Sequence, residues 1–229
     1  MSVISDTSVI IPFGSKNADR IRVAAYVHDY YKNIFSDWNV LFQVSKVQPF
    51  PRAKVVNDAV KMVDSPLLLL VDADSLCPPE EIQEALEMAQ EAPGLVYCYT
   101  YYQQLDRIPT EYCLLHANDL LKAFEDWPIK LEIPGASSTG CVAISREAFL
   151  EVGGYDEFFT QWAPDDLDLR ERCSELWPER RVPGILRHLW HGYRQKHDVP
   201  MDADFRNVKA NYEYLYKKQT ERYKKQMQK

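Results

Sequence analysis

One stretch constrains the fold of this chain more than any other. Leu67–Val71 is a run of five apolar residues that leads directly into Asp72-Ala73-Asp74 and is then stopped by Ser75 and by Pro78-Pro79. A short, continuous apolar run between breakers is typical of a strand that is covered on both faces, not of an amphipathic helix. The stretch therefore predicts a buried strand of a parallel or mixed α/β sheet, with two carboxylates at its carboxyl end.

The two acids have two interpretations. Ligands of open α/β sheets gather at the carboxyl ends of the strands, and Asp72 and Asp74 share a face if the strand continues to Asp74. Neighbouring carboxylates repel each other unless a cation intervenes, and oxygen-rich pairs suit Mg²⁺ or Mn²⁺. Alternatively, Asp74 or Ser75 simply caps the helix that Pro78-Pro79 begins. The stretch by itself leaves both interpretations open.

Size and composition narrow the class of protein. A chain of 229 residues suits one α/β domain with a small appendage. The net charge of -7 argues against a protein that binds nucleic acid over its whole surface. The five cysteines are odd in number and widely spaced, which fits reduced thiols. Because no signal-peptide pattern and no apolar run of membrane-spanning length is evident, we expect a cytoplasmic protein without a membrane span.

The order of elements predicts the architecture. Strands are expected at 7–13, 39–44, 67–71 and 95–101, with a helix after each of the first three. This alternation predicts an α/β fold with a mostly parallel central sheet flanked by helices. Prolines interrupt the stretch 103–133, where we expect an irregular, partly helical insertion that shapes an acceptor pocket. Further expectations are a strand at 140–145, a helix at 146–152, a helix starting near Pro164 and a strand at 182–190.

The C-terminal part concentrates basic charge among tyrosines. From Lys209 onward it carries most of its Lys and Arg residues close to four tyrosines. Two interpretations are a solvated helix face with a frayed end and a docking site for an acidic surface. We divide the chain into a single domain at residues 1–204 and a basic, aromatic helical tail at 205–229.

Two helix starts carry candidate functional residues. Arg52 and Lys54 lie where backbone N–H groups favour anions and can together hold a diphosphate; the alternative is a surface pair before a helix. Near Pro164, acids in a first helical turn are favoured by the macrodipole without any function. The functional interpretation is that Asp166, kept ionised by the dipole, accepts a proton from a hydroxyl while Trp162 stacks on a sugar ring.

His188 and His191 form a late pair three residues apart. On a regular strand such residues point to opposite faces, so the two imidazoles can meet one ion only if the chain turns between them. The alternative is a purely structural pair.

Taken in order, these segments resemble the metal-dependent GT-A fold glycosyltransferases, particularly the β-1,4-galactosyltransferase group and family 2 bacterial enzymes such as the chondroitin polymerases. The resemblance runs from about Val9 to His191. Phe50–Asn57 is similar to the segment of that family that contacts the base and ribose, and Asp72-Ala73-Asp74 resembles its D-x-D motif. The stretch 140–166 is similar to its acceptor and donor-sugar region.

The resemblance implies a role for each matching residue. Asp166 is implied as the catalytic base. The implied substrate-binding residues are Pro12, Phe13, Phe50, Arg52, Asp72, Gly140, Trp162 and Asp165, and the implied ligands of Mn²⁺ or Mg²⁺ are Asp74, His191 and His188. The implied reaction is inverting transfer of a hexose or N-acetylhexosamine, with the galactose type favoured, from a UDP-sugar to an acceptor hydroxyl. Three departures from the family are a missing arginine after Phe13, Ala163-Pro164 in place of Gly-Gly, and Asp165 in place of Glu.

Two alternatives belong to other classes. A haloacid-dehalogenase-type phosphotransferase also starts from an apolar strand ending in Asp-x-Asp and would use Asp72 as nucleophile, although Leu76 stands where it usually has Thr or Val. A non-catalytic module that binds nucleotide sugars or glycans would keep the fold without turnover. The acceptor class stays open among glycans, lipid-linked saccharides, proteins and modified nucleic acid.

Overall fold

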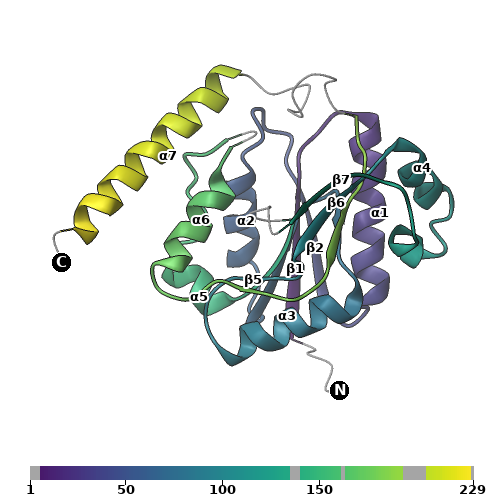
Figure 1. The fold of residues 1–229 in the computed structure, drawn as a ribbon, viewed down its shortest axis with the longest axis horizontal. Coiled ribbons are helices and arrows are strands. Elements are labelled where there is room, and N and C mark those ends of the chain that lie inside the picture. Colours follow the sequence, from purple (N-terminus) through teal and green to yellow (C-terminus); the bar gives the residue numbers. More distant parts are fainter. Residues whose placement is uncertain (1–5, 135–139, 161–162, 193–204, 228–229) are drawn as a thin grey trace.

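The computed structural model describes residues 6–134, 140–160, 163–192 and 205–227 (Figure 1). The strands are β1 Thr7–Phe13, β2 Asn39–Val44, β3 Leu67–Val71, β4 Ser75–Leu76, β5 Val96–Tyr97, β6 Tyr101–Leu105, β7 Ile129–Pro134, β8 Cys141–Ser145, β9 Arg180–Arg181 and β10 Ile185–His188. The helices are α1 Ala18–Ile34, α2 Arg52–Lys61, α3 Pro79–Glu91, α4 Arg107–Leu115, the 3-10 helix η1 Leu120–Phe124, α5 Arg146–Glu151, α6 Asp165–Ser174 and α7 Phe205–Gln226.

The larger sheet has six strands in the order β2-β1-β3-β8-β5-β9. β1 pairs in parallel with β2 and β3, and β5 pairs in parallel with β9, whereas β8 is antiparallel to both β3 and β5. All of its strands except β8 therefore point the same way, which confirms the expected mostly parallel central sheet. In Figure 1 the strands β1 and β2 lie between α1 on one side and α2 on the other.

The apolar run that dominates the sequence is the centre of this sheet. Every residue of β3 is buried, with exposed fractions of 2% or less. β3 is covered on both faces because helices pack against the sheet, which is the arrangement that a continuous apolar strand requires. The carboxylates that follow β3 are consequently delivered to one edge of a rigid scaffold.

A second, smaller sheet has the order β4-β10-β6-β7. The single strand expected at 95–101 is instead two short strands, β5 and β6, that belong to different sheets. The chain changes sheets at Thr100, where the carbonyl oxygen of Gly184 accepts from the N–H groups of both Thr100 and Tyr101 at 2.9 and 3.0 Å. The stretch 103–133 is partly helical as expected, but β7 was not expected there, although its alternation of apolar and charged residues is typical of a strand.

Neither Asp72 nor Asp74 caps α3, the helix that follows them. The N-cap of α3 is Pro78, and no side chain caps it. Ser75 belongs to β4, and its backbone N–H donates to the carbonyl oxygen of Asp72. The interpretation of Asp74 or Ser75 as a helix cap is therefore wrong, and the acids are left for another role.

The C-terminal segment is helical, as expected, but it is not solvated all round. Leu215 of α7 is 1% exposed, and the cationic groups of Lys218 and Arg222 pair with acids of the preceding domain. In Figure 1, α7 lies on the side of the molecule where α6 is found. The boundary at residue 204 between a domain and a tail stays a prediction.

Within the described part of the chain, no helix combines the length and the apolar character that crossing a bilayer requires.

Gly154 offers a test of how the loop after α5 is held. It has a φ of +66°, and a Cβ there would lie 2.6 Å from Asn57 Oδ1, which accepts from the N–H of Tyr155. Gly153 has a φ of +81°, but a Cβ there would meet nothing within 4 Å. We expect Gly153→Ala to cost about 1–2 kcal/mol from backbone strain alone.

Gly154→Ala should lower the free energy of unfolding by roughly 1–3 kcal/mol more than Gly153→Ala, because it adds a steric clash to the same strain. Urea denaturation of the two variants measures the difference. Equal losses in both variants would contradict the close approach of Asn57.

Candidate active site

The carboxyl end of β3 is joined to the start of β8 by Asp72 and Gly140. The N–H of Asp72 donates to the carbonyl oxygen of Gly140 at 2.9 Å, and the N–H of Gly140 donates to Asp72 Oδ2 at 3.1 Å. Gly140 has a φ of +85°, and a Cβ there would lie 2.4 Å from Leu186 Cδ1. The structure thus brings together two of the predicted substrate-binding residues and explains why the second is glycine.

Arg52, in the first turn of α2, connects three carboxylates from two other elements. Its Nη2 donates to Asp72 Oδ1 at 2.8 Å. Its Nη1 donates to Asp165 Oδ2 at 2.9 Å and to Asp166 Oδ1 at 2.8 Å. The predicted helix-start cation and the predicted acids at the start of α6 therefore meet at the end of β3.

Burial makes these ion pairs strong. The side chains of Arg52 and Asp165 are only 15% and 5% exposed. Burial by itself opposes the charge of Arg52, but the carboxylates of Asp166, Asp72 and Asp165 outweigh it and raise the pKa of the guanidinium well above its usual range. Burial also raises the pKa of Asp165, although Arg52 counteracts this effect. The cluster carries more negative than positive charge, so it is poised to accept a further cationic or proton-donating group.

A second cluster is built on Asp74, two residues further along the chain than Asp72. The Nε2 atoms of His188 and His191 lie 3.5 and 3.1 Å from the two carboxylate oxygens of Asp74. One ligand atom from each of these side chains lies within 4.8 Å of the others, a spacing that a single metal ion can bridge. Both histidines reach Asp74 because β10 ends at His188, so that His191 is not bound to strand geometry; the N–H of Leu189 donates to the carbonyl oxygen of Asp74 at 2.8 Å.

The chemistry of these donors fits a divalent transition-metal ion. Carboxylate oxygen suits Mg²⁺ and Mn²⁺, whereas imidazole nitrogen suits transition metals, so the mixed set favours Mn²⁺ over Mg²⁺. Burial alone would raise the pKa of Asp74, but the two imidazoles hold it well below its usual value. Burial lowers the pKa of His191, and Asp74 partly offsets this. A deprotonated carboxylate and a neutral imidazole are the forms that bind a metal.

The aromatic residues predicted to contact substrate lie near the carboxyl end of β1. Phe13 stacks on Phe42 with ring centroids 5.6 Å apart. Phe50 packs so closely on Gly14 that a Cβ there would lie 2.1 Å from its ring. Pro12 and Phe13 end β1 beside β3, at the same edge of the sheet as Asp72. Trp162 lies outside the described residues.

Sequence reasoning missed two residues of the site. Arg20 lies in the first turn of α1, and its Nη2 is 3.5 Å from Asp74 Oδ2. Tyr155 lies under Arg52, whose guanidinium carbon is 5.0 Å from the ring centroid. Arg20 follows the helix cap Asn17 and has the same helix-start placement that drew attention to Arg52, so that signal was available. Nothing local distinguishes Tyr155, whose position depends on Asn57.

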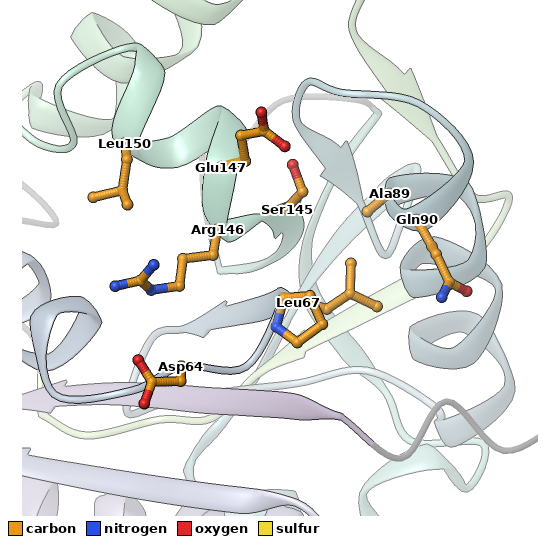
Figure 2. A pocket seen from close by; sticks show the side chains of 9 residues that line it. Asp64, Leu67, Ala89, Gln90, Ser145, Arg146, Glu147 and Leu150 are labelled. Carbon is orange, nitrogen blue, oxygen red and sulfur yellow. The ribbon is translucent and has the colours of Figure 1, made fainter.

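A surface pocket elsewhere does not belong to this site. Figure 2 shows it lined by Leu67, Arg146 and Glu147, among others. Leu67 begins β3, whereas Asp72 follows its end, so the two places are separated by roughly 17 Å along the strand. The pocket lies at the end of the sheet that open α/β folds do not generally use for ligands.

Comparison with known families identifies the class of protein that this fold and site define. The model described as "Glycosyl transferase family 2" matches residues 25–153, which is more than half of the chain. The chain belongs to glycosyl transferase family 2, and it is a glycosyltransferase. A second model, described as "N-terminal domain of galactosyltransferase", matches residues 118–191 and thus includes both histidines of the site. No curated protein matches the chain.

Solved structures with the same fold include galactosyltransferases. The catalytic domain of Drosophila beta1,4-galactosyltransferase 7, in complex with xylobiose, has a TM-score of 0.57 and 12% identity over 88% of this chain and 76% of that one. A mutant of the same enzyme, in complex with manganese, UDP-Gal and xylobiose, has a TM-score of 0.54 and 12% identity over 87% and 76%.

A third match is GalNAc-T7 with UDP, GalNAc and Mn²⁺, with a TM-score of 0.51 and 12% identity over 84% of this chain and 46% of that one. At this identity the three likenesses establish the GT-A fold that the sequence predicted.

Removing the Arg52 cation tests whether it holds the carboxylate cluster together. Arg52→Met should lower the free energy of unfolding at neutral pH by about 3–5 kcal/mol, because three partly buried carboxylates lose their shared partner. Without the cation, the folded protein binds protons more tightly than the unfolded chain, so stability falls as pH rises and the loss shrinks toward acid pH. Urea denaturation between neutral and mildly acid pH measures both effects.

Lys54→Met is the matched control, since Lys54 lies on the same helix, is 55% exposed and pairs with Asp58. It should leave stability close to that of the unsubstituted protein at every pH. A loss in Arg52→Met that does not change with pH would contradict the role of the carboxylates.

Proposed function

We propose that the chain is an inverting, metal-dependent transferase that moves a hexose or N-acetylhexosamine of the galactose type from a UDP-sugar to an acceptor hydroxyl. The observation that carries this proposal is the meeting of two different clusters at the end of β3. Asp74, His188 and His191 supply a metal-binding set, and Arg52, Asp72, Asp165 and Asp166 supply a carboxylate cluster with one cation. Such a transfer needs both kinds of group.

The metal-binding set suits Mn²⁺ better than Mg²⁺, and two of the solved structures with this fold are complexes with manganese. In the proposed site, Asp74, His188 and His191 hold the ion. When bound, the ion supplies positive charge that stabilises the departing diphosphate. Arg20, 3.5 Å from Asp74, adds a cation on the same side and stands in for the arginine that is missing after Phe13.

Asp166 is the proposed base. It lies in the first turn of α6, where the helix dipole favours its ionised form. Its Oδ1 lies 2.8 Å from Arg52 Nη1, and a diphosphate offers the guanidinium other oxygens with which to pair. Asp166 then takes the proton of the acceptor hydroxyl as that oxygen attacks the anomeric carbon from the face opposite the leaving group, and the configuration inverts.

The remaining predicted residues bind the donor and the acceptor. Pro12, Phe13 and Phe50 face the base and ribose, and Asp72 and Gly140 line the diphosphate and sugar. Asp165 and Trp162 contact sugar. Of the two cations that the sequence suggests for the diphosphate, only Arg52 belongs to the proposed site, because Lys54 is 55% exposed and pairs with Asp58.

The proposed partners are a UDP-sugar and an acceptor glycan or other hydroxyl-bearing molecule, and a cytoplasmic setting stays a prediction. Xylobiose is bound in two of the structures that share the fold, which makes xylobiose the first acceptor to test.

Asp166→Asn tests the base. We expect kcat for sugar transfer, measured as UDP release from a panel of UDP-sugars with Mn²⁺ and acceptor sugars, to fall ~10²–10⁴-fold, because an amide cannot accept the proton. Asp37→Asn, at an exposed position before β2, serves as the control and should be unaffected. Near-normal turnover in Asp166→Asn would remove it from the role of base.

Asp74→Ala tests the metal-binding set. The variant should lose Mn²⁺ stimulation of UDP release, and Mn²⁺ binding followed by electron paramagnetic resonance should weaken by about 10–100-fold or more, since a direct ligand matters at least as much as the outer-shell partners for which that range is typical. Asp64→Ala, beside the unrelated pocket, is the control. Mn²⁺ stimulation that survives in Asp74→Ala would place the ion elsewhere.

A further inference from the structure

Helix α7 packs against the part of the fold that carries the proposed base. Its Asn211 is 3% exposed, and the side-chain Nδ2 donates to the carbonyl oxygen of Thr160 at 2.9 Å. Leu215, one turn further on, is also buried. Figure 1 shows α7 on the same side of the molecule as α6. The helix is therefore fixed to the domain through its inner face.

The centre of this contact is Asp168, in the first turn of α6, whose side chain has no exposed surface. Lys218 Nζ lies 2.7 Å from Asp168 Oδ1, Arg222 contacts the same oxygen, and Arg172 Nε donates to Oδ2 at 2.8 Å. Burial opposes the ionisation of Asp168, but Lys218 and Arg172 outweigh it and lower the pKa of this carboxyl. A buried carboxylate that loses such partners is strongly destabilised, so its position depends on α7.

The segment before α6 is held by the same helix. Tyr214 donates its hydroxyl to Asp156 Oδ2 at 3.0 Å, and Lys218 Nζ lies 2.7 Å from the same oxygen. The ring of Phe158 stacks on Tyr214 with centroids 3.9 Å apart. Helix α7 thus contacts the chain both before and after Asp165 and Asp166.

The start of α6 needs this support. Three acids crowd its first turn, and no side chain caps it. Their mutual repulsion is relieved from two sides: Arg52 pairs with Asp165 and Asp166, and α7 pairs with Asp168. If the cations of α7 are removed, Asp168 loses these partners and the first turn of α6 is free to shift toward Arg52. If Arg52 is removed, the same turn is free to shift toward the cations of α7.

We propose that α7 is a positioning element of the active site, in which Lys218 and Arg222 act through Asp168 to hold the first turn of α6 and so to place Asp166 against the acceptor hydroxyl. This inference rests on the proposed function of Asp166. It makes Lys218 and Arg222 positioning residues, which touch neither substrate nor metal. A displacement of about 1 Å at a reacting group can cost ~10²-fold in rate, so a modest shift of α6 is enough to be measured.

The test compares two double variants that each remove two positive charges from α7. Lys218→Met with Arg222→Met acts on the inner face, and Lys217→Met with Lys224→Met acts on exposed positions of the outer face. The inner-face variant should lower kcat at least about 10-fold while the KM for the UDP-sugar changes less than about 3-fold, because the metal-binding set and most of the proposed donor-binding residues lie outside α6. The outer-face variant should keep both parameters.

Conservative replacement separates positioning from bulk stability. Arg222→Lys keeps the charge at Asp168 and should recover most of the kcat that Arg222→Met loses. Hydrogen exchange of the peptide that contains Asp165–Ser174 should be faster by about 10-fold or more in the inner-face variant only. If the inner-face variant does not fold, Tyr214→Phe removes just the bond to Asp156 and should lower kcat by a smaller factor with unchanged melting temperature.

Each result decides a separate claim. Unchanged kcat in a folded inner-face variant, or a rise in donor KM without a fall in kcat, overturns the positioning role. If the unsubstituted protein releases no UDP from any donor, the proposed function fails instead. Hydrogen exchange in α6 then still tests whether α7 holds the first turn of α6. Unchanged exchange overturns this claim, and faster exchange confined to the inner-face variant supports it.

Discussion

The pairing of one guanidinium with three carboxylates is the interaction on which the rest of the site depends. Asp72 follows the central strand and Asp165 and Asp166 begin α6, so without Arg52 the fold would bring like charges together in a partly buried place. Such a cluster is costly for stability and useful for chemistry, because a single cation leaves the group short of positive charge.

The metal-binding set and the carboxylate cluster stand next to each other because β3 delivers Asp72 and Asp74 to the same edge. The smaller sheet supplies the two histidines. Its strand β10 pairs with β4 and with β6, and this pairing ends at the place where His188 and His191 reach Asp74. The glycosyltransferase fold thus uses two sheets for one centre. Helix α7 likewise brings distant parts of the chain together, because its Lys218 pairs with Asp168 of α6.

Several features could be predicted from local patterns. The buried run of β3, the helix starts at Arg52 and Asp165, and the mostly parallel sheet all follow from apolar periodicity and from breakers, which act over a few residues. The two strands that share 95–105 could not be separated this way, because the change of sheet at Thr100 depends on the carbonyl of Gly184 far along the chain. The antiparallel insertion of β8 between β3 and β5 likewise depends on pairing between distant segments.

The sequence by itself determined which groups are available: acids after an apolar strand, an arginine at a helix start, two histidines late in the chain and a basic C-terminal helix. Only the tertiary structure decided which of them meet. His188 and His191 face one carboxylate because the strand ends between them, and Lys218 and Arg222 pair with acids of α6 although sequence alone equally allowed a solvated face. Side-chain type is a local property, whereas the partner of a charge depends on contacts that no stretch of sequence contains.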